Sequence, residues 1–198
     1  MKNYVCINGK KTELTAEQMK LRGVVEEPAV SMSEDGKTVK IGEYAFIVLK
    51  KNDETVELLL RGTLGKDTEF GSTCDFKTSK AKEILDKFAL EIEGLVGKEN
   101  LLEHTVDLTS LDGLKDCGSV NTKMSLLTLA QAQEYVETLD EYKYDGWWWL
   151  ATPWSAPKHG YTNGVMCVAP SGFMFNGISD FSINGVRPFC VLKSNIFV

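Results

Sequence analysis

The stretch Gly146-Trp147-Trp148-Trp149-Leu150-Ala151 marks the point at which the sequence changes character. Successive side chains of a strand point to opposite faces, so the three tryptophans predict a strand that needs apolar cover on both faces. We interpret them as scaffold in preference to ligand contacts. From here on, short apolar runs alternate with stretches rich in Pro, Gly, Ser and Asn, which predicts an antiparallel sheet with long loops. The runs are residues 147–151, 165–169, 173–175 and 186–192.

The distribution of charge divides the chain at nearly the same place. Residues 1–140 contain 18 Lys and Arg and 25 Asp and Glu, whereas residues 141–198 contain 4 and 3 but hold 12 of the 19 aromatic residues. This composition is typical of a tightly packed β-rich core or of a recognition surface, and composition alone favours the core. The formal charge of −6 argues against a main role in nucleic-acid binding, because contact with phosphates needs a basic face.

The sequence also bears on location and on the state of the thiols. No apolar run approaches the ~20 residues that a membrane span requires. The N-terminal MKNYVCINGKK lacks the apolar stretch of a secretory signal, so we expect a soluble protein that is compatible with a phage virion or the cytoplasm. The cysteines show no CxxC spacing and predict reduced thiols; they are Cys6, Cys74, Cys117, Cys167 and Cys190.

Upstream of the tryptophans, the sequence predicts two helices and a hairpin. Apolar residues from 81 to 95 recur at helical spacing after Ser79, a candidate cap. A second helix is predicted from Thr128 to about Leu139, since Thr128 and Gln131 have the spacing of a capping box. Runs 41–49 and 55–60 predict the hairpin, and 105–108 a short strand. Together these elements predict an α+β fold with two amphipathic helices against a mostly antiparallel sheet.

Residues 1–23 predict a small separate module. Strands at residues 4–7 and 10–14 flank an Asn8-Gly9 turn, and Thr15 begins a short helix that ends at Gly23. The module is too small to bury a core, so we interpret it as a docking module for a larger assembly, such as a phage particle, or for a second copy of the chain. Residues 24–40 are polar and predict a linker with room for an edge strand, which leaves 41–198 as the main domain.

Two end motifs resemble those of an uncharacterised domain family of phage and gut-bacterial proteins. They are GWWWLATP at residues 146–153 and GVRPF at 185–189, where family members carry WWLRSP and GVRPAL. The similarity extends to the hairpin of residues 41–60 and to Ser125-Leu126-Leu127-Thr128, so it covers about residues 40–193. The departures are Ala151-Thr152 in place of Arg-Ser, Trp154 in place of a common Gly, and Phe189-Cys190 in place of Ala-Leu.

The resemblance implies a C-type-lectin-like fold, shared in outline with the formylglycine-generating enzyme. Several family members look like target proteins of diversity-generating retroelements, in which hypermutated loop codons near the C-terminus vary ligand binding. The leader residues 8–18 are similar to N-terminal modules of such phage-type proteins. The resemblance thus implies a variable receptor or adhesin, with a protein or glycan ligand on a cell surface.

Two nearly uncharged loops, residues 153–163 and 171–184, are the predicted recognition surface. Strands hold both ends of each loop, which is the usual way to build a binding site. The alternative is that the apolar residues of the second loop are inward-facing strand residues. Trp154, His159 and Tyr161 are the strongest candidates, as large amphipathic groups outside the strand pattern. The candidate contact set is Trp154, Ser155, His159, Tyr161, Phe173, Phe175, Asn176, Ser179, Asp180, Phe181, Ile183 and Asn184.

The same region argues against a metal site or a cofactor. Calcium needs several oxygen ligands, usually including two or more carboxylates, and Asp180 is the single carboxylate residue between 146 and 198. The sequence contains no P-loop, GxSxG, HExxH or zinc spacing. We therefore expect no metal, no cofactor and no catalysis. An invariant phage structural protein remains an alternative function.

An enzyme of the formylglycine-generating type is the other alternative. It would require Cys167 and Cys190 to lie within disulfide reach in a cleft. A cysteine in a strand is more often a small buried apolar residue, and His104 beside Glu103 is expected to be solvated. Arg187 is expected to be buried or half-buried in a structural role, with Asp145 or a cluster of backbone carbonyls as its partner.

Overall fold

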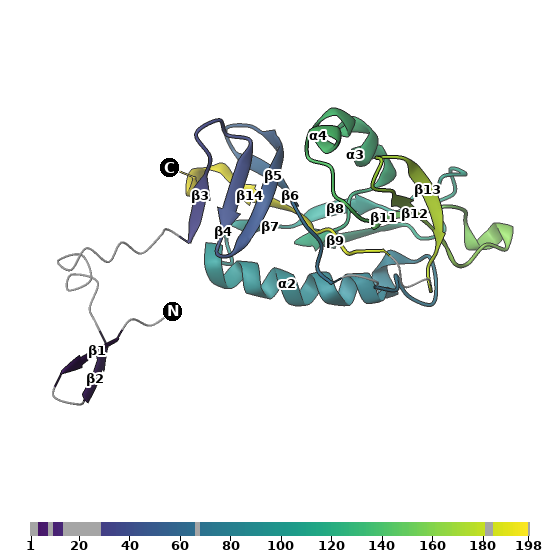
Figure 1. The fold of residues 1–198 in the computed structure, drawn as a ribbon. Helices are drawn as coiled ribbons and strands as arrows, with labels where there is room; N and C mark the ends of the chain where they lie inside the picture. Colours follow the sequence, from purple (N-terminus) through teal and green to yellow (C-terminus); the bar gives the residue numbers. More distant parts are fainter. Residues whose placement is uncertain (1–3, 8–9, 14–28, 66–67, 181–183, 198) are drawn as a thin grey trace.

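The computed structural model describes residues 4–7, 10–13, 29–65, 68–180 and 184–197 (Figure 1). Strands β1 (Tyr4–Ile7) and β2 (Lys10–Glu13) pair in antiparallel orientation, which confirms the predicted N-terminal hairpin. The predicted Asn8-Gly9 turn and the predicted helix of residues 15–23 lie outside the described residues.

A large antiparallel sheet has the strand order β10-β14-β6-β5-β4-β3, with β7 beside β14. The predicted hairpin is present as β5 (Tyr44–Lys51) and β6 (Thr55–Leu60). The last strand, β14 (Phe189–Lys193), pairs with β6 along five residues and also contacts β10 (Met124–Ser125) and β7 (Leu101–Leu102). Segments from opposite ends of the main domain thus form the middle of one sheet.

The linker predicted at residues 24–40 contains the edge strand for which the sequence left room, at residues 30–32, but residues 38–40 belong to the same sheet as well and are not linker. Strands β3 (Val30–Met32) and β4 (Thr38–Ile41) form a hairpin that pairs with β5. The predicted strand at 41–49 is divided at Gly42, whose positive φ of 56° turns the chain between β4 and β5. Val39 and Ile41 are buried in the core, so alternation of apolar and polar residues, rather than overall polarity, identifies this strand.

Helix α2 (Lys80–Val96) is the predicted first helix and lies along one side of the molecule (Figure 1). The Ser79 side chain accepts a hydrogen bond from the Lys82 backbone N–H at 3.0 Å, and Gly97 follows the last turn with a φ of 88°. One face of the helix is buried in the main core through Ala81, Leu85, Phe88, Ala89, Ile92 and Val96.

The predicted second helix is divided in two. Helix α3 (Leu129–Glu134) begins with the expected capping box of Thr128 and Gln131, and α4 (Val136–Glu141) follows it. The break is at Tyr135, which has φ −100° and ψ 19° and whose hydroxyl donates to Glu57 Oε2 at 2.8 Å. A tertiary contact with β6 thus coincides with the end of the first segment.

A second antiparallel sheet has the order β11-β12-β13, as the apolar runs after residue 146 predict. Its strands are β11 (Trp148–Pro153), β12 (Gly164–Val168) and β13 (Met174–Ile178). Strands β8 (His104–Asp107) and β9 (Ser119–Thr122) form a separate pair. The described residues also form short 3-10 helices, which are η1 (Phe76–Thr78), η2 (Pro157–His159) and η3 (Ser194–Ile196).

The tryptophan strand β11 separates two apolar clusters, as its alternating side chains require. Trp149 lies in the larger cluster, with α2 and the main sheet, and Trp148 lies in the smaller one, with α3 and α4. Both side chains are almost completely buried, which supports their interpretation as scaffold. The coarse prediction of an α+β fold with mostly antiparallel sheets is confirmed.

Candidate ligand-binding site

The three-stranded sheet places Trp149, Cys167 and Phe175 side by side on one face. Their backbones are register partners across β11, β12 and β13. The Trp149 indole donates to the backbone carbonyl of Thr68 at 2.8 Å and packs edge-on against the Phe70 ring, with ring centroids 5.6 Å apart. The inner end of this row is therefore fixed, while its outer end, Phe175, is half exposed.

A cavity of about 360 Å³ opens beside this row. The volume is within the range of small-molecule and side-chain pockets. No charged side chain lines it among the described residues, and the lining is largely apolar. The lining residues are Trp147, Trp149, Cys167, Phe175, Asn176, Gly177, Ile178 and Asn184.

Gly177 allows the Trp149 ring to pack directly on the backbone of β13 at the wall of the cavity. A Cβ atom built on Gly177 would lie 2.7 Å from Cζ3 and 3.0 Å from Cη2 of Trp149. These distances are shorter than real Cβ contacts, so any side chain at 177 would displace the indole.

Asn184 supplies a polar group at the wall of the cavity. Its side chain is only 2% exposed, and Oδ1 has no hydrogen-bond partner in the described part of the chain. Burial raises the pKa of the neighbouring Cys167 thiol to about 11, and the Asn184 side chain opposes this rise. An unpaired buried acceptor costs about 1–3 kcal/mol. Oδ1 has almost no exposed surface, so a ligand donor reaches it only if the Asn184 side chain moves toward the cavity.

Strand β13 also presents apolar side chains outward. Phe173, Phe175 and Ile178 are 62%, 51% and 50% exposed. The two phenyl rings lie 6.0 Å apart, so they form one contiguous apolar surface. Clustered exposed apolar side chains of this kind typically mark interaction sites.

Asp112 holds the other predicted loop, residues 153–163, against the rest of the protein through hydrogen bonds. Its Oδ2 atom accepts hydrogen bonds from the Ser155 hydroxyl at 2.6 Å and the Ala156 backbone N–H at 3.2 Å, and lies 2.8 Å from His159 Nδ1. Hydrogen bonds from Ser110 and Ser155 hold the pKa of the Asp112 carboxyl well below its ordinary value. Ser155 and His159 are therefore held in place by Asp112, while His159 remains exposed, and their role as ligand contacts stays a prediction.

Trp154 and Tyr161 pack on each other at the base and tip of this loop. Their rings are edge-to-face, with centroids 4.9 Å apart, and Trp154 is half-buried while Tyr161 is exposed. Neither residue lines the cavity at β13. The structure therefore separates the strongest sequence candidates from the cavity, although the two loops meet where the Ser179 N–H donates to the Asn163 carbonyl at 2.7 Å.

The remaining candidates have mixed outcomes. Phe175, Asn176 and Asn184 line the cavity, and Asp180 is exposed. Ser179 is completely buried, so its prediction as a surface contact is wrong; its backbone bonds to both Gly71 and Asn163 pull it inward. Phe181 and Ile183 lie outside the described residues. Sequence reasoning missed the cavity residues Trp147, Trp149, Cys167, Gly177 and Ile178 and the loop fastener Asp112.

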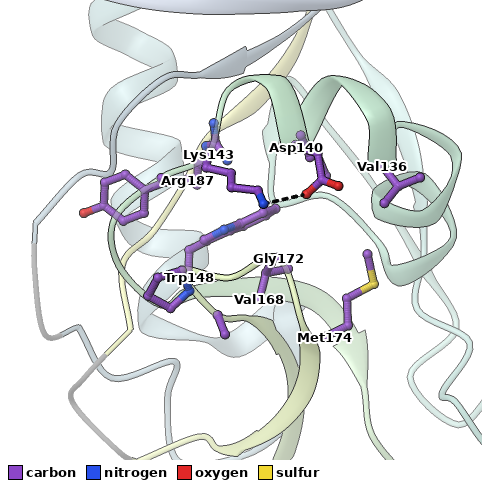
Figure 2. Close-up of a pocket in the computed structure, with 12 residues that line it drawn as sticks. Val136, Asp140, Lys143, Trp148, Val168, Gly172, Met174 and Arg187 are labelled. Carbon is purple, nitrogen blue, oxygen red and sulfur yellow. Dashed lines mark ion pairs between the residues drawn. The ribbon is translucent and has the colours of Figure 1, made fainter.

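A second, much smaller cavity lies between α4 and the other face of the three-stranded sheet (Figure 2). Its volume of about 20 Å³ is enough for a single water molecule. Trp148, Val168 and Met174 line it, and an ion pair joins Lys143 Nζ and Asp140 Oδ1 at 3.5 Å (Figure 2). The cavity is too small for an organic ligand.

Arg187 borders this small cavity and is only 1% exposed. Its Nε–H donates to the Leu60 carbonyl at 2.8 Å, its Nη2–H donates to the Tyr142 carbonyl at 3.5 Å, and the guanidinium lies 5.0 Å from the centroid of the Trp148 ring. Burial lowers the pKa of Arg187 to about 10. The carbonyl alternative of the sequence prediction is therefore correct, and Asp145 is not its partner among the contacts of the described residues.

His104 is half-buried and its Nδ1 atom has almost no exposed surface, so it is not the solvated residue that the sequence predicts. Its Nε2 lies 2.8 Å from Ser125 Oγ, and its ring packs edge-on against Phe189 with centroids 5.1 Å apart. Burial lowers the pKa of His104 to about 4. Ser125 is almost completely buried, so a substrate has no access to this pair.

The cysteines of the enzyme alternative lie on strands of different sheets, Cys167 on β12 and Cys190 on β14. Burial raises the pKa of Cys190 to about 12, and that of Cys167 is also high. Thiols of this kind stay protonated at neutral pH and are poor nucleophiles.

In the part of the chain that the structure describes, no group of three or more His, Cys, Asp or Glu side chains is arranged to hold a metal ion. The described helices include none that is both long and apolar enough to cross a membrane. Comparison of the sequence with protein-family models, curated proteins and solved structures finds no match.

Proposed function

We propose that this chain is a non-catalytic ligand-binding protein of the receptor or adhesin type. Its binding site is the cavity beside β13 together with the exposed apolar side chains of that strand. The observation that carries this proposal is the uncharged cavity of about 360 Å³, which has an unpaired buried amide oxygen in its wall and a half-exposed phenyl ring at its mouth. Apolar contact with one or two oriented polar groups is the usual composition of a ligand site.

The chemistry of the candidate residues favours binding over catalysis. The two thiols of the enzyme alternative have raised pKa values, and Ser125, the partner of the half-buried His104, is almost completely buried. By contrast, Phe173 and Phe175 expose ring surface to water, which is unfavourable unless a partner covers it.

The scaffold that we propose for this site is C-type-lectin-like. Three features of the architecture support this proposal. They are the pairing of the last strand, β14, with β6 in the main sheet, the long helix α2 along that sheet, and the separate three-stranded sheet. If a retroelement diversifies the chain, the exposed side chains of Phe173, Phe175 and Ile178 are the ones that can vary without disturbing the core. A reverse-transcriptase gene beside this gene, with a near-repeat of its 3′ end that differs only at adenines, would be the genomic evidence.

The test compares Phe175→Ser with Leu90→Ser. Leu90 is 70% exposed on α2, so it is a matched control that removes an exposed apolar side chain elsewhere. Wild type and both variants are applied to a displayed peptide library and to a glycan array. We expect wild type and Leu90→Ser to retain the same members, and Phe175→Ser to lose them while its melting temperature stays within about 2 °C of wild type. Equal capture by Phe175→Ser, or no capture by wild type on either array, would overturn the proposal.

A further inference from the structure

We infer that the ligand is an extended peptide segment that adds a fourth strand to the sheet at β13 and places a large apolar side chain in the cavity. This inference rests on the proposed function, because it uses the same site and specifies its occupant. Three features of the site support it: the unpaired backbone groups of β13, the row of side chains formed by Trp149, Cys167 and Phe175, and the polarity of the cavity.

The hydrogen-bond register shows which backbone groups of β13 face outward. The Ala169 N–H donates to the Phe173 carbonyl, and the Ser179 N–H donates to the Asn163 carbonyl, so residues 173 and 179 both face β12. Bonded and non-bonded positions alternate in an antiparallel pair, so residues 175 and 177 face β12 as well. The backbone N–H and C=O groups of Met174, Asn176 and Ile178 therefore point away from the sheet.

These outward groups form an open edge. Strand β13 has β12 as its single sheet neighbour, and no hydrogen bond joins the outward groups to another element within the described ranges. Figure 1 shows β13 on the outer side of β11 and β12. Alternating donors and acceptors that recur about every 6.8 Å match the backbone of another extended chain, and neither a sugar nor a lipid carries that repeat.

The side-chain row explains why an added strand would fill the cavity. Trp149, Cys167 and Phe175 are neighbours on one face across three strands, and a residue paired with Phe175 would be the next member of that row. Four consecutive residues of β13, 175–178, line the cavity, so the cavity lies along the same edge. The added residue thus projects its side chain toward the cavity.

The cavity also selects the type of side chain. It has no charged lining residue in the described part of the protein, so an ionised side chain would lose its hydration without compensation. Asn184 Oδ1 is a buried acceptor that needs a donor. A tryptophan suits both features, because its indole is apolar apart from one N–H donor. The structure therefore points to an extended segment with a central Trp.

The experiment selects heptapeptides with a fixed central Trp from a displayed library and measures the affinity of synthetic copies by fluorescence anisotropy. Each copy carries one backbone N-methyl group, placed at successive positions. We expect methylation to weaken binding about tenfold at alternate positions and to leave the positions between them nearly unchanged, since only every second N–H of an added strand faces β13. Replacing the central Trp by Ala should weaken binding by more than tenfold.

On the protein side, Asn176→Pro removes one outward N–H without removing a bond to β12, and Leu90→Ser is the control. We expect Asn176→Pro to lose affinity for the unmethylated peptide and Leu90→Ser to retain it. Peptides whose binding requires Phe175 but ignores N-methylation at every position would overturn strand addition and leave the proposed function intact. If glycans bind in a way that requires Phe175 and peptides do not bind, strand addition is likewise overturned and the proposed function is kept. Peptides that bind Phe175→Ser as tightly as wild type would overturn both.

Discussion

Replacement of Arg187 tests whether the shape or the charge of this side chain stabilises the fold. The pKa lowered to about 10 corresponds to about 3 kcal/mol of unfavourable charge burial. The bond to the Leu60 carbonyl returns about 1.5–3 kcal/mol, and the contact with the Trp148 ring about 2 kcal/mol. These opposing contributions nearly cancel, so the charge itself adds little net stability.

We therefore expect Arg187→Met, which fills much of the same space, to lie within about 2 kcal/mol of wild type in free energy of unfolding. Arg187→Ala should be destabilised by a further ~2–4 kcal/mol, because it leaves a cavity between Trp148 and β6. Urea unfolding followed by tryptophan fluorescence and far-ultraviolet circular dichroism measures both values. If Arg187→Met is as unstable as Arg187→Ala at pH 7, the charge is essential and the reasoning is wrong.

Three further predictions concern other parts of the molecule. Gly185→Ala should lower the free energy of unfolding by about 1–3 kcal/mol, since a Cβ would lie 2.5 Å from Cγ2 of Thr63. The control Gly62→Ala has open space around it and should lower this free energy by less than about 1 kcal/mol. Equal free energies of unfolding for the two variants in urea would contradict the prediction. Because burial lowers the pKa of His104 from 6.5 to about 4, the free energy of unfolding should fall by up to about 3 kcal/mol as the pH falls from 6.5 to 4. If a His104→Leu variant shows the same fall, His104 is not its cause. Asp112→Asn should speed hydrogen exchange at the Ala156 amide without changing exchange in α2. Since folding lowers the pKa of Asp112, hydrogen exchange at this amide should also become faster in wild type at strongly acidic pH. Unchanged exchange at Ala156 in the variant would show that Asp112 does not hold the loop.

The elements that the sequence predicts well are those with local signals. Helix α2 has an apolar stripe, a Ser79 cap and a terminal Gly97, and the β5–β6 hairpin has two long apolar runs. The strands after Gly146 follow from runs that a helix would not produce. By contrast, β3 and β4 are short, and the pairing of β3 with β4 and of β4 with β5 joins them to the sheet in a way that their length and polarity do not indicate. The end of α3 at Tyr135 coincides with a contact to Glu57, 78 residues away, which no local pattern contains.

The candidate site, like the end of α3, depends on contacts between residues that are far apart in the sequence. Composition identifies the aromatic loops, and Phe175, Asn176 and Asn184 are correctly included in the predicted contact set as cavity residues. The cavity lies beside a row of side chains that the register of three strands brings together, and Trp149 packs on Gly177 at its wall; neither feature is visible in the sequence without the pairing partners. Likewise, the contact between His159 and Asp112 joins residues that are 47 positions apart, so no local pattern contains it.

The central place of β14 has a consequence for biosynthesis. Leu59 of β6 cannot meet Phe189 until the ribosome has added about 130 more residues, so the middle of the main sheet is left open throughout elongation. During that time β6 offers an unpaired apolar edge to any neighbouring nascent chain. Slow translation or premature termination before residue 193 should therefore favour aggregation, and a chaperone that covers β6 would be most useful in that interval.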